Sequence, residues 1–386
     1  MTKKYKICVV SSSRADFGIL TPLLKAIEAS KHLSLFLIAT GAHLSREHGF
    51  TINEVESSEI KVNCKIDISV DNSSAKTIAD TMSRATSQFA NKLVKISPDI
   101  VLLLGDRYEM LGIASAAMCL SIPIAHIHGG EVTEGANDDA IRHAITKLSH
   151  LHFVCHDVYK NRVIQLGEKP ETVFNTGALG IDNIYNTTKI SRSDLEAQLN
   201  IRFSATNIMI SYHSATLDKD NEKACSTMLE DLSKLKETTL IFTMPNADLG
   251  GKKIASLLRN FCDEHKNAYF FDNLGLQRYI SCLSQADFVI GNSSSGILEA
   301  PFLGCYTINI GTRQKGRLQP KTVINVKPYP SEILTLVMKL KEEIRINGRP
   351  PASHLFGDGS ASKKIASILE DEVSMISTKK SFHDIY

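Results

Sequence analysis

The run Asp99-Ile100-Val101-Leu102-Leu103-Leu104 is followed by a stretch rich in Ala, Met and Leu over 108–120, and then by Ile122-Pro123-Ile124-Ala125-His126-Ile127. The two outer runs are short and mostly apolar, which is typical of strands buried on both faces of a parallel sheet. The stretch between them has the length and composition of a crossover helix. This order predicts an α/β domain built on a parallel sheet.

The same alternation continues in both directions along the chain. Further short runs rich in β-branched or aromatic residues predict strands at 6–10, 35–39, 151–155, 207–212, 239–243, 268–271, 287–290 and 306–310. Residues 151–155 are expected to be the last strand of the first sheet, and the polar segment 189–202 to begin a new unit. The sequence therefore predicts two doubly wound domains that face a cleft, with ligands bound at the carboxyl ends of the strands.

Composition excludes several classes of protein. The chain has 386 residues, enough for two domains, and its 44 Lys and Arg against 42 Asp and Glu argue against a protein that binds duplex nucleic acid. No apolar run approaches the roughly 18 residues of a membrane span, and the apolar stretch after the basic N-terminus is too short for a signal peptide. Eight scattered cysteines without a CxxC pair predict reduced thiols in a cytoplasmic protein.

Two groups of polar residues directly follow predicted strands in the first half. Residues 11–18 are expected to form a loop carrying Arg14, which either helps a helix N-terminus to bind an anion such as phosphate or only covers the helix end. Asp106 and Arg107 follow the strand at 100–104. Asp106 is either a reactive carboxylate at a strand end or a cap of the next helix.

The segment 128–143 holds the densest group of polar residues. It combines paired glycines with four carboxylates, which are Glu131, Glu134, Asp138 and Asp139. Like charges held together raise the pKa of at least one carboxyl, which suits a general acid or base. His126, His128 and Glu131 are residue types that can bind a metal. Alternate strand residues point to opposite faces and no HxxxH or DxD pattern accompanies them, so no metal site is predicted.

In the second half, His213 follows a predicted strand, where an imidazole can pair with phosphate or move protons near neutral pH. Residues 291–301 run from a strand through a Gly- and Ser-rich turn into a helix that carries Glu299. Such a turn can hold a diphosphate, and Glu299 can accept hydrogen bonds from two ribose hydroxyls. Asn246 lies in another turn after a strand, and Arg313 lies in a basic loop that either offsets an anionic ligand or is merely solvated.

Taken in order, these motifs resemble the hydrolysing UDP-N-acetylglucosamine 2-epimerases of bacterial sialic acid synthesis, over nearly the whole chain. The series that carries the resemblance is Ser13-Arg14-Ala15-Asp16, Gly105-Asp106-Arg107, His126-Ile127-His128-Gly129-Gly130-Glu131, Asp138-Asp139-Ala140-Ile141-Arg142-His143, His213, Gly291-Asn292-Ser293-Ser294-Ser295-Gly296 and Asn309-Ile310-Gly311-Thr312-Arg313-Gln314. The resemblance implies two Rossmann-like domains of the GT-B type, over 1–178 and 179–364, and a C-terminal helix in 365–386 that returns to the first domain. It implies no cofactor and no metal, a UDP-sugar as ligand, a homodimer or homotetramer, and a product used for sialic acid, capsule or other surface glycans.

The resemblance also implies a reaction, in which UDP-N-acetylglucosamine and water give N-acetylmannosamine and UDP. Anti elimination of UDP would give 2-acetamidoglucal, to which water then adds. The catalytic roles fall to Asp106, Glu131, Asp138 and His213. Binding of UDP or sugar falls to Arg14, Ala15, Arg107, His128, Asn246, Ser294, Ser295, Gly296, Glu299 and Arg313. Several members of the family carry Glu at the position of His128, so that either Asp106 or Glu131 is left to take the C2 proton.

Alternatives remain open at this stage. Closely related enzymes act on UDP-2,4-diacetamido-2,4,6-trideoxy-glucose in legionaminic acid synthesis, and residues 45–73 are expected to decide between the two sugars. A GT-B glycosyltransferase, a non-hydrolysing epimerase and a non-catalytic nucleotide-sugar sensor are the other hypotheses. Incubation with UDP-N-acetylglucosamine and no acceptor separates them, because release of UDP together with free N-acetylmannosamine is expected only of the hydrolysing epimerase.

Overall fold

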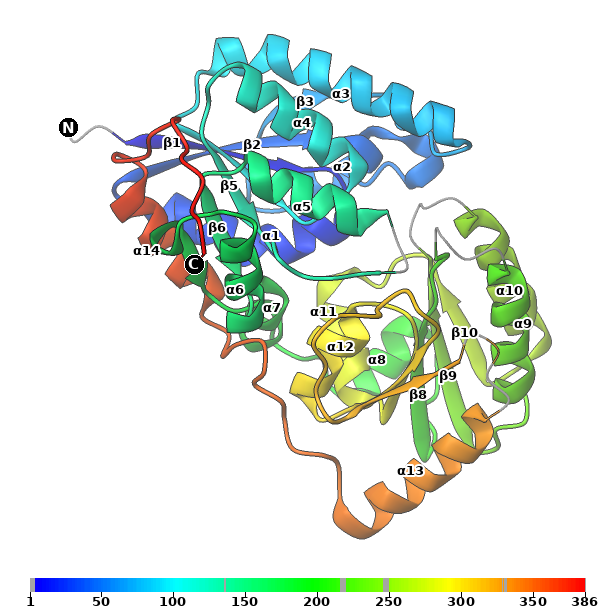
Figure 1. Cartoon of the computed structure of the whole chain (residues 1–386). Coiled ribbons are helices and arrows are strands. Elements are labelled where there is room, and N and C mark those ends of the chain that lie inside the picture. Colours follow the sequence, from blue (N-terminus) through cyan, green and yellow to red (C-terminus); the bar gives the residue numbers. More distant parts are fainter. Residues whose placement is uncertain are drawn as a thin grey trace. The chain divides into compact units, whose positions relative to one another are not determined.

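The computed structural model describes residues 4–134, 137–215, 220–245, 250–327, 329 and 332–385 (Figure 1). The chain divides into two compact units. Unit 1 comprises Met1–Glu131, Asp138–Asn186 and Phe356–Tyr386, and unit 2 comprises Val132–Asn137 and Thr187–Leu355. The division after Asn186 and Leu355 differs from the expected boundaries at 178 and 364, because the helix that begins at Leu179 packs into the core of unit 1.

Unit 1 is built on a seven-stranded parallel sheet of order β3-β2-β1-β4-β5-β6-β7. Its strands are β1 (Tyr5–Ser11), β2 (Leu33–Thr40), β3 (Val62–Ile66), β4 (Ile100–Leu104), β5 (Ile124–Ile127), β6 (Leu151–Val154) and β7 (Val173–Asn175). The order of the strands reverses between β1 and β4. Loops that leave neighbouring strands at such a switch point diverge and leave room for a ligand.

Helices cover both faces of this sheet (Figure 1). They are α1 (Arg14–Ala29), α2 (Ile52–Glu56), α3 (Ala75–Ile96), α4 (Tyr108–Cys119), α5 (Asp138–Leu148), α6 (Asp157–Gln165), α7 (Leu179–Asn186) and α14 (Ala361–Glu372), with the 3-10 turns η1 (Gly41–Leu44), η2 (Arg46–His48) and η3 (Pro170–Thr172). Alternate residues of a strand point to opposite faces. In β1, Val9 accordingly packs in the core with α1 and Cys8 in the core with α3 and α4.

The helix α14 comes from the end of the chain but packs in unit 1, beside α1 (Figure 1). Ile365 and Leu369 of α14 are fully buried in one core with Leu20 and Leu24 of α1. The first turn of α14 is capped by Asp182 of α7, whose buried carboxylate accepts hydrogen bonds at 2.9 and 2.6 Å from two backbone N–H groups of that turn. Such a cap satisfies donors that the helix itself leaves without partners.

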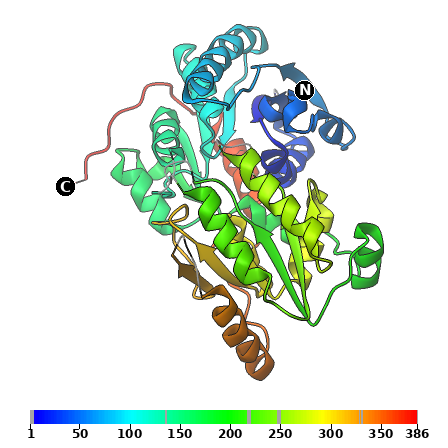
Figure 2. The same cartoon turned by 90° about the vertical axis from the view of Figure 1, so that its right-hand side faces the viewer.

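Unit 2 contains a second parallel sheet, of order β10-β9-β8-β11-β12-β13. Its strands are β8 (Thr206–Ser211), β9 (Thr238–Thr243), β10 (Ala268–Phe271), β11 (Phe288–Gly291), β12 (Tyr306–Ile310) and β13 (Val323–Val326). The helices are α8 (Arg192–Leu199), α9 (Asn221–Leu232), α10 (Gly251–Glu264), α11 (Gly275–Gln285), α12 (Ser295–Leu298) and α13 (Ile333–Asn347), with the 3-10 turn η4 (Ala300–Leu303). Figure 2 shows α9 and α10 side by side on one face of this sheet, where they share a core with α13.

The predicted α/β class with two parallel sheets is confirmed, but three strands were missed. All three, β3, β7 and β13, lie at sheet edges and are short and partly exposed, so they lack the continuous apolar pattern of buried strands. The expectation that 151–155 ends the first sheet is therefore wrong, because β7 follows it.

The expected loop over 11–18 is also wrong. The helix α1 begins at Arg14, because the Ser13 side chain accepts a hydrogen bond from the Asp16 N–H as an N-cap. Among the described residues, no helix is both long and apolar enough to span a membrane. All eight cysteines are thiols rather than disulfides.

Candidate functional site

The predicted site residues lie at the carboxyl ends of strands or in the first turns of helices, in two groups. Those in unit 1 are Arg14, Ala15, Asp106, Arg107, His128, Glu131 and Asp138. Those in unit 2 are His213, Ser294, Ser295, Gly296, Glu299 and Arg313. Asn246 lies outside the described residues.

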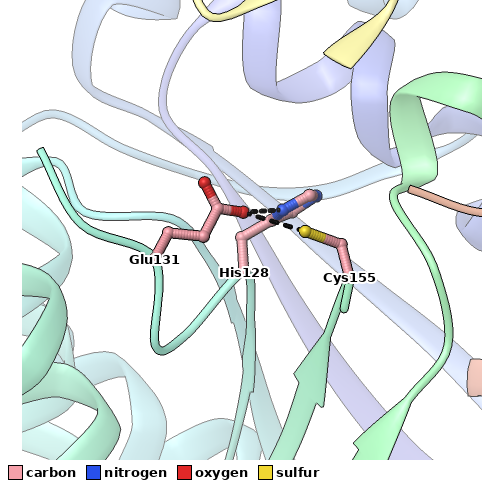
Figure 3. A group of neighbouring side chains, drawn as sticks. All are labelled: His128, Glu131 and Cys155. Atoms are coloured by element: carbon pink, nitrogen blue, oxygen red, sulfur yellow. Dashed lines mark hydrogen bonds and ion pairs between the residues drawn. The ribbon is translucent and has the colours of Figure 1, made fainter. Parts of the chain in front are cut away.

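The centre of the group in unit 1 is the Glu131 carboxylate. Its Oε1 lies 2.6 Å from Nδ1 of His128 and 3.3 Å from the thiol of Cys155, which donates a hydrogen bond to it (Figure 3). An ionised carboxylate only accepts hydrogen bonds, so Nδ1 of His128 carries the proton in this contact. The Glu131 side chain is 2% exposed and that of His128 14%. Thus Glu131 is held by two donors, of which Cys155 was not predicted.

The backbone of the turn after β5 fixes this geometry. The sheet places the ends of β5 and β6 side by side, and the His128 N–H donates to the Phe153 carbonyl at 2.9 Å. His128 itself has a φ of +66°, a left-handed conformation that non-glycine residues adopt only with strain. At Gly130, with φ +75°, a Cβ would lie 2.5 Å from the Tyr159 carbonyl oxygen of α6, so only glycine fits. The turn therefore approaches α6 closely and points Glu131 back toward His128.

Arg142 of α5 links the Asp106 carboxylate to the backbone of Glu131. Its guanidinium is 1% exposed, donates to the Glu131 carbonyl at 2.9 Å and forms an ion pair with the Asp106 carboxylate. Burial acts to lower the pKa of Arg142, but the carboxylates of Asp106, Glu131 and Asp139 outweigh it and raise that pKa. Asp106 is thus engaged with a fixed cation, whereas Glu131 is contacted at its carboxylate by an imidazole and a thiol.

His126 does not join the group around Glu131. Its Nε2 donates to the Gly105 carbonyl at 2.7 Å, and its Nδ1 lies 3.1 Å from the Thr146 hydroxyl. Burial lowers the pKa of His126 to about 3, which keeps the ring neutral at physiological pH. The role of His126 is to tie β5 to the loop that carries Asp106.

The loops after β1 and β4 meet at the switch point of the sheet. The buried hydroxyl of Ser12 lies 2.7 Å from Glu109 and 3.0 Å from Asp16, and Arg107 donates to Glu109 at 2.6 Å. Burial raises the pKa of Asp16. The positive charge of Arg107 acts to lower this pKa, and the carboxylate of Glu109 acts to raise it further. Arg14 and Ala15 begin α1 beside this group, half-buried and exposed respectively.

In unit 2, the backbone of His213 is held by Asn292. The His213 N–H donates to Oδ1 of Asn292 at 2.7 Å, and Nδ2 of Asn292 donates to the His213 carbonyl at 2.8 Å. Burial, followed by the charge of Arg313, lowers the pKa of His213 to about 3. The His213 ring is therefore neutral near neutral pH.

The Ser- and Gly-rich turn after β11 has both packing and polar features. Gly291, with φ +137°, approaches β8 so closely that a Cβ would lie 2.1 Å from the Ser211 carbonyl oxygen. Ser294 occupies the N-cap position of α12, and the Ser295 hydroxyl contacts both Tyr279 and Glu299. Gly296 is buried, and its carbonyl accepts a hydrogen bond from Thr307 of β12. Glu299 and Ser295 thus form one polar pair at the end of β11.

Arg313 borders a hollow of about 250 Å³ at the ends of β8, β11 and β12, which Tyr212, Asn292 and Thr312 also line. The Arg313 guanidinium donates to the Asn292 carbonyl at 3.0 Å. A neighbouring hollow of about 320 Å³ is lined by Lys315 and Arg317 among others. Asp220 also lines the first hollow, so the excess of basic side chains at this edge comes from Arg313, Lys315 and Arg317 together, which suits an anionic group.

Sequence reasoning assigned no role to Cys155, Arg142, Asn292 or Gln314. Gln314 is buried and donates to the Asn292 carbonyl at 2.8 Å, parallel to Arg313. Arg142, Asn292 and Gln314 lie within the motifs that carry the family resemblance, and their place in those motifs could have indicated a role for them. Cys155 lies outside every motif, and only the adjacency of β5 and β6 reveals it.

The buried histidines predict a loss of stability in mild acid. Burial lowers the pKa of His126 and His213 to about 3 and that of His43 to about 4, so between pH 7 and 5 protons bind to the unfolded state only. Each histidine is expected to cost about 2 kcal/mol of unfolding free energy over that range. Calorimetry should show a melting temperature that falls steadily from pH 7 to pH 5, and less steeply in a His43→Gln variant. A constant melting temperature would contradict this.

Comparisons with known proteins identify relatives of the chain. A profile of the UDP-N-acetylglucosamine 2-epimerase family matches residues 25–370. The chain is 46% identical over 324 residues to the GDP/UDP-N,N'-diacetylbacillosamine 2-epimerase (hydrolyzing) of Campylobacter jejuni. The aligned residues cover 83% of this chain and 84% of that protein. It is 33% identical to the UDP-N,N'-diacetylbacillosamine 2-epimerase (hydrolyzing) of Legionella pneumophila, over 95% of both chains. In fold it is similar to the UDP-GlcNAc 2-epimerase of Neisseria meningitidis bound to UDP-GlcNAc, with a TM-score of 0.80, 18% identity and coverage of 95% of this chain and 100% of that one.

Proposed function

Because the chain belongs to the UDP-N-acetylglucosamine 2-epimerase family, we propose that it is a hydrolysing 2-epimerase that converts UDP-N-acetylglucosamine and water to N-acetylmannosamine and UDP. The observation that carries the proposal is the Glu131 carboxylate, held by His128 and Cys155 at the end of β5. It occurs in a chain whose relatives are named as hydrolysing 2-epimerases. A positioned carboxylate is what the first step of such a reaction needs.

In the proposed reaction, Glu131 removes the C2 proton while UDP leaves from C1, which gives 2-acetamidoglucal. Water then adds across the double bond, with a proton delivered to the opposite face of C2 and hydroxide to C1. Glu131 is preferred over Asp106 as the base because Asp106 is already bound by the Arg142 guanidinium. Asp138, in the first turn of α5, is proposed as the second acid/base group.

UDP recognition is assigned to unit 2. The basic edge at Arg313 would bind the diphosphate, together with Ser294, Ser295 and the backbone at Gly296. Glu299 would accept hydrogen bonds from the ribose hydroxyls, in exchange for its contact with Ser295. The neutral ring of His213 would donate a hydrogen bond to the departing diphosphate, which stabilises charge that develops at that oxygen. Arg14, Ala15, Arg107, His128 and Asn246 are retained as proposed substrate contacts.

UDP-N,N'-diacetylbacillosamine, the 2,4-diacetamido-2,4,6-trideoxy sugar, is a second candidate substrate. The 46% identity to a Campylobacter jejuni enzyme named for that sugar favours it. The reaction steps at C1 and C2 would be the same, because the two sugars differ at C4 and C6. Residues 45–73, which form η2, α2 and β3 with their connecting loops, are the proposed determinants of this choice.

Proton NMR of the products in deuterated water tests the reaction and the substrate together. Each of the two UDP-sugars is incubated with the enzyme and no acceptor. We expect UDP and a free 2-epimerised sugar with deuterium at C2 from the preferred substrate. A product without deuterium at C2 would contradict the elimination. A UDP-sugar with inverted C2, in place of free sugar, would indicate a non-hydrolysing epimerase. If neither UDP-sugar were consumed, a glycosyltransferase or a sensor would be favoured.

A further inference from the structure

The side chains around Glu131 form a set of three different metal-binding groups. One ligand atom from each of His128, Glu131 and Cys155 lies within 4.8 Å of the other two (Figure 3). Cys155 and the Glu131 side chain are each 2% exposed. Imidazole, carboxylate and thiolate are the three ligand types that zinc accepts, whereas magnesium and calcium require oxygen ligands.

Backbone contacts hold this set of side chains in place. His128 is fixed by its hydrogen bond to β6 and its left-handed backbone, and Cys155 directly follows β6. The Glu131 carbonyl is bound by the buried guanidinium of Arg142. A zinc ion with bonds of about 2.3 Å to sulfur and about 2.0–2.2 Å to nitrogen and oxygen brings its ligand atoms roughly 3–4 Å apart. The contacts of 2.6 Å from Oε1 of Glu131 to Nδ1 of His128 and of 3.3 Å to the thiol of Cys155 already lie near that range.

We propose that Zn²⁺, or another thiophilic divalent cation, binds to His128, Glu131 and Cys155 and thereby inhibits the enzyme. Cys155 binds as the thiolate, so its thiol proton is released to solvent. The His128 ring then carries its proton on Nε2 rather than on Nδ1, which frees Nδ1 for the metal. Three protein ligands leave a fourth position for water. The proposed inhibition rests on the proposed function, because the metal would occupy the carboxylate that is assigned to proton removal. The proposed metal binding does not rest on that function.

Cobalt(II) provides a readout of binding that is independent of activity. Titration of the metal-free protein with Co²⁺ should produce a thiolate-to-cobalt charge-transfer band in the near ultraviolet that saturates at one ion per chain. Cys155→Ser and His128→Asn should each weaken cobalt binding by at least about tenfold, since even loss of an outer-shell partner costs ten- to a hundredfold. Cys119→Ser removes an exposed thiol elsewhere in unit 1 and should leave the band unchanged. A band of equal strength in Cys155→Ser would overturn the site.

Inhibition is then measured with Zn²⁺ itself, with each variant compared to its own metal-free rate. The enzyme should lose activity at one equivalent of Zn²⁺ and recover it on addition of EDTA, and Cys155→Ser should require at least about tenfold more zinc. Full activity with the cobalt site occupied would contradict the inhibition. A protein that shows the cobalt band but no epimerase activity would contradict the proposed function and leave the metal site standing.

Discussion

Replacement of Glu131 by Gln is expected to lower turnover by about a hundredfold or more, because a carboxamide cannot take the C2 proton. Gln keeps an oxygen that can accept the hydrogen bonds from His128 and from the Cys155 thiol. The turn after β5 should therefore keep its shape, and the loss should appear in kcat rather than in folding. The measurement is UDP release at saturating substrate, with the melting temperature recorded for each variant.

Glu171→Gln is the matched control, since it neutralises an exposed carboxylate of unit 1 in η3. It should retain the parent rate. Asp106→Asn separates the two candidate bases. If Glu131→Gln turned over at nearly the parent rate while Asp106→Asn did not, the C2 proton would have to be assigned to Asp106 instead.

Replacement of Arg142 by Met is expected to destabilise unit 1 by about 3 kcal/mol, the lower end of the cost of removing one partner from a buried ion pair. Arg142 is 1% exposed, and Met can fill most of the buried space that its side chain occupies. The Asp106 carboxylate and the Glu131 carbonyl would, however, lose the hydrogen bonds that the guanidinium donates. The lower end applies because Asp106 is 26% exposed and water can solvate part of its charge. Calorimetric unfolding of the full chain at pH 7 measures the effect.

Two further variants isolate the cause. Arg345→Met removes an arginine from an exposed ion pair with Glu342, and should change stability by less than about 1 kcal/mol. Combining Arg142→Met with Asp106→Asn removes both charges and should recover part of the loss. An Arg142→Met protein as stable as the parent would show that the guanidinium is not needed to hold the two carboxylate-bearing loops together.

The strands in the interiors of the sheets could be predicted from sequence, as could the edge strand β10, whose sequence is largely aromatic. The run at 100–104 is apolar throughout because β4 has a strand on each side and helices on both faces. The edge strand β3 alternates between half-buried and exposed residues, and β7 has only three residues. Each pairs on one side only, with the strand that precedes it in the sequence, so neither carries the continuous apolar pattern of a strand buried on all sides.

The same distinction applies to the site. Glu131 and Asp106 could be singled out because they directly follow apolar strands in loops crowded with polar residues. The link between them could not, because Arg142 reaches both from a helix that begins after the second loop. Cys155 ends a predicted strand and lies outside every quoted motif, so from the sequence alone it resembles a core residue; its contact with Glu131 depends on the pairing of β6 with β5. The order of strands in space, rather than in sequence, decides these contacts.

The packing of α14 on α1 has a consequence for synthesis on the ribosome. Leu20 and Leu24 are made early, but Ile365 and Leu369, which bury them, are made after nearly all the rest of the chain. Until then, the nascent polypeptide presents an apolar helix face that chaperones can bind. Unit 1 therefore begins to form first and is completed last, after the main segment of unit 2 has been translated.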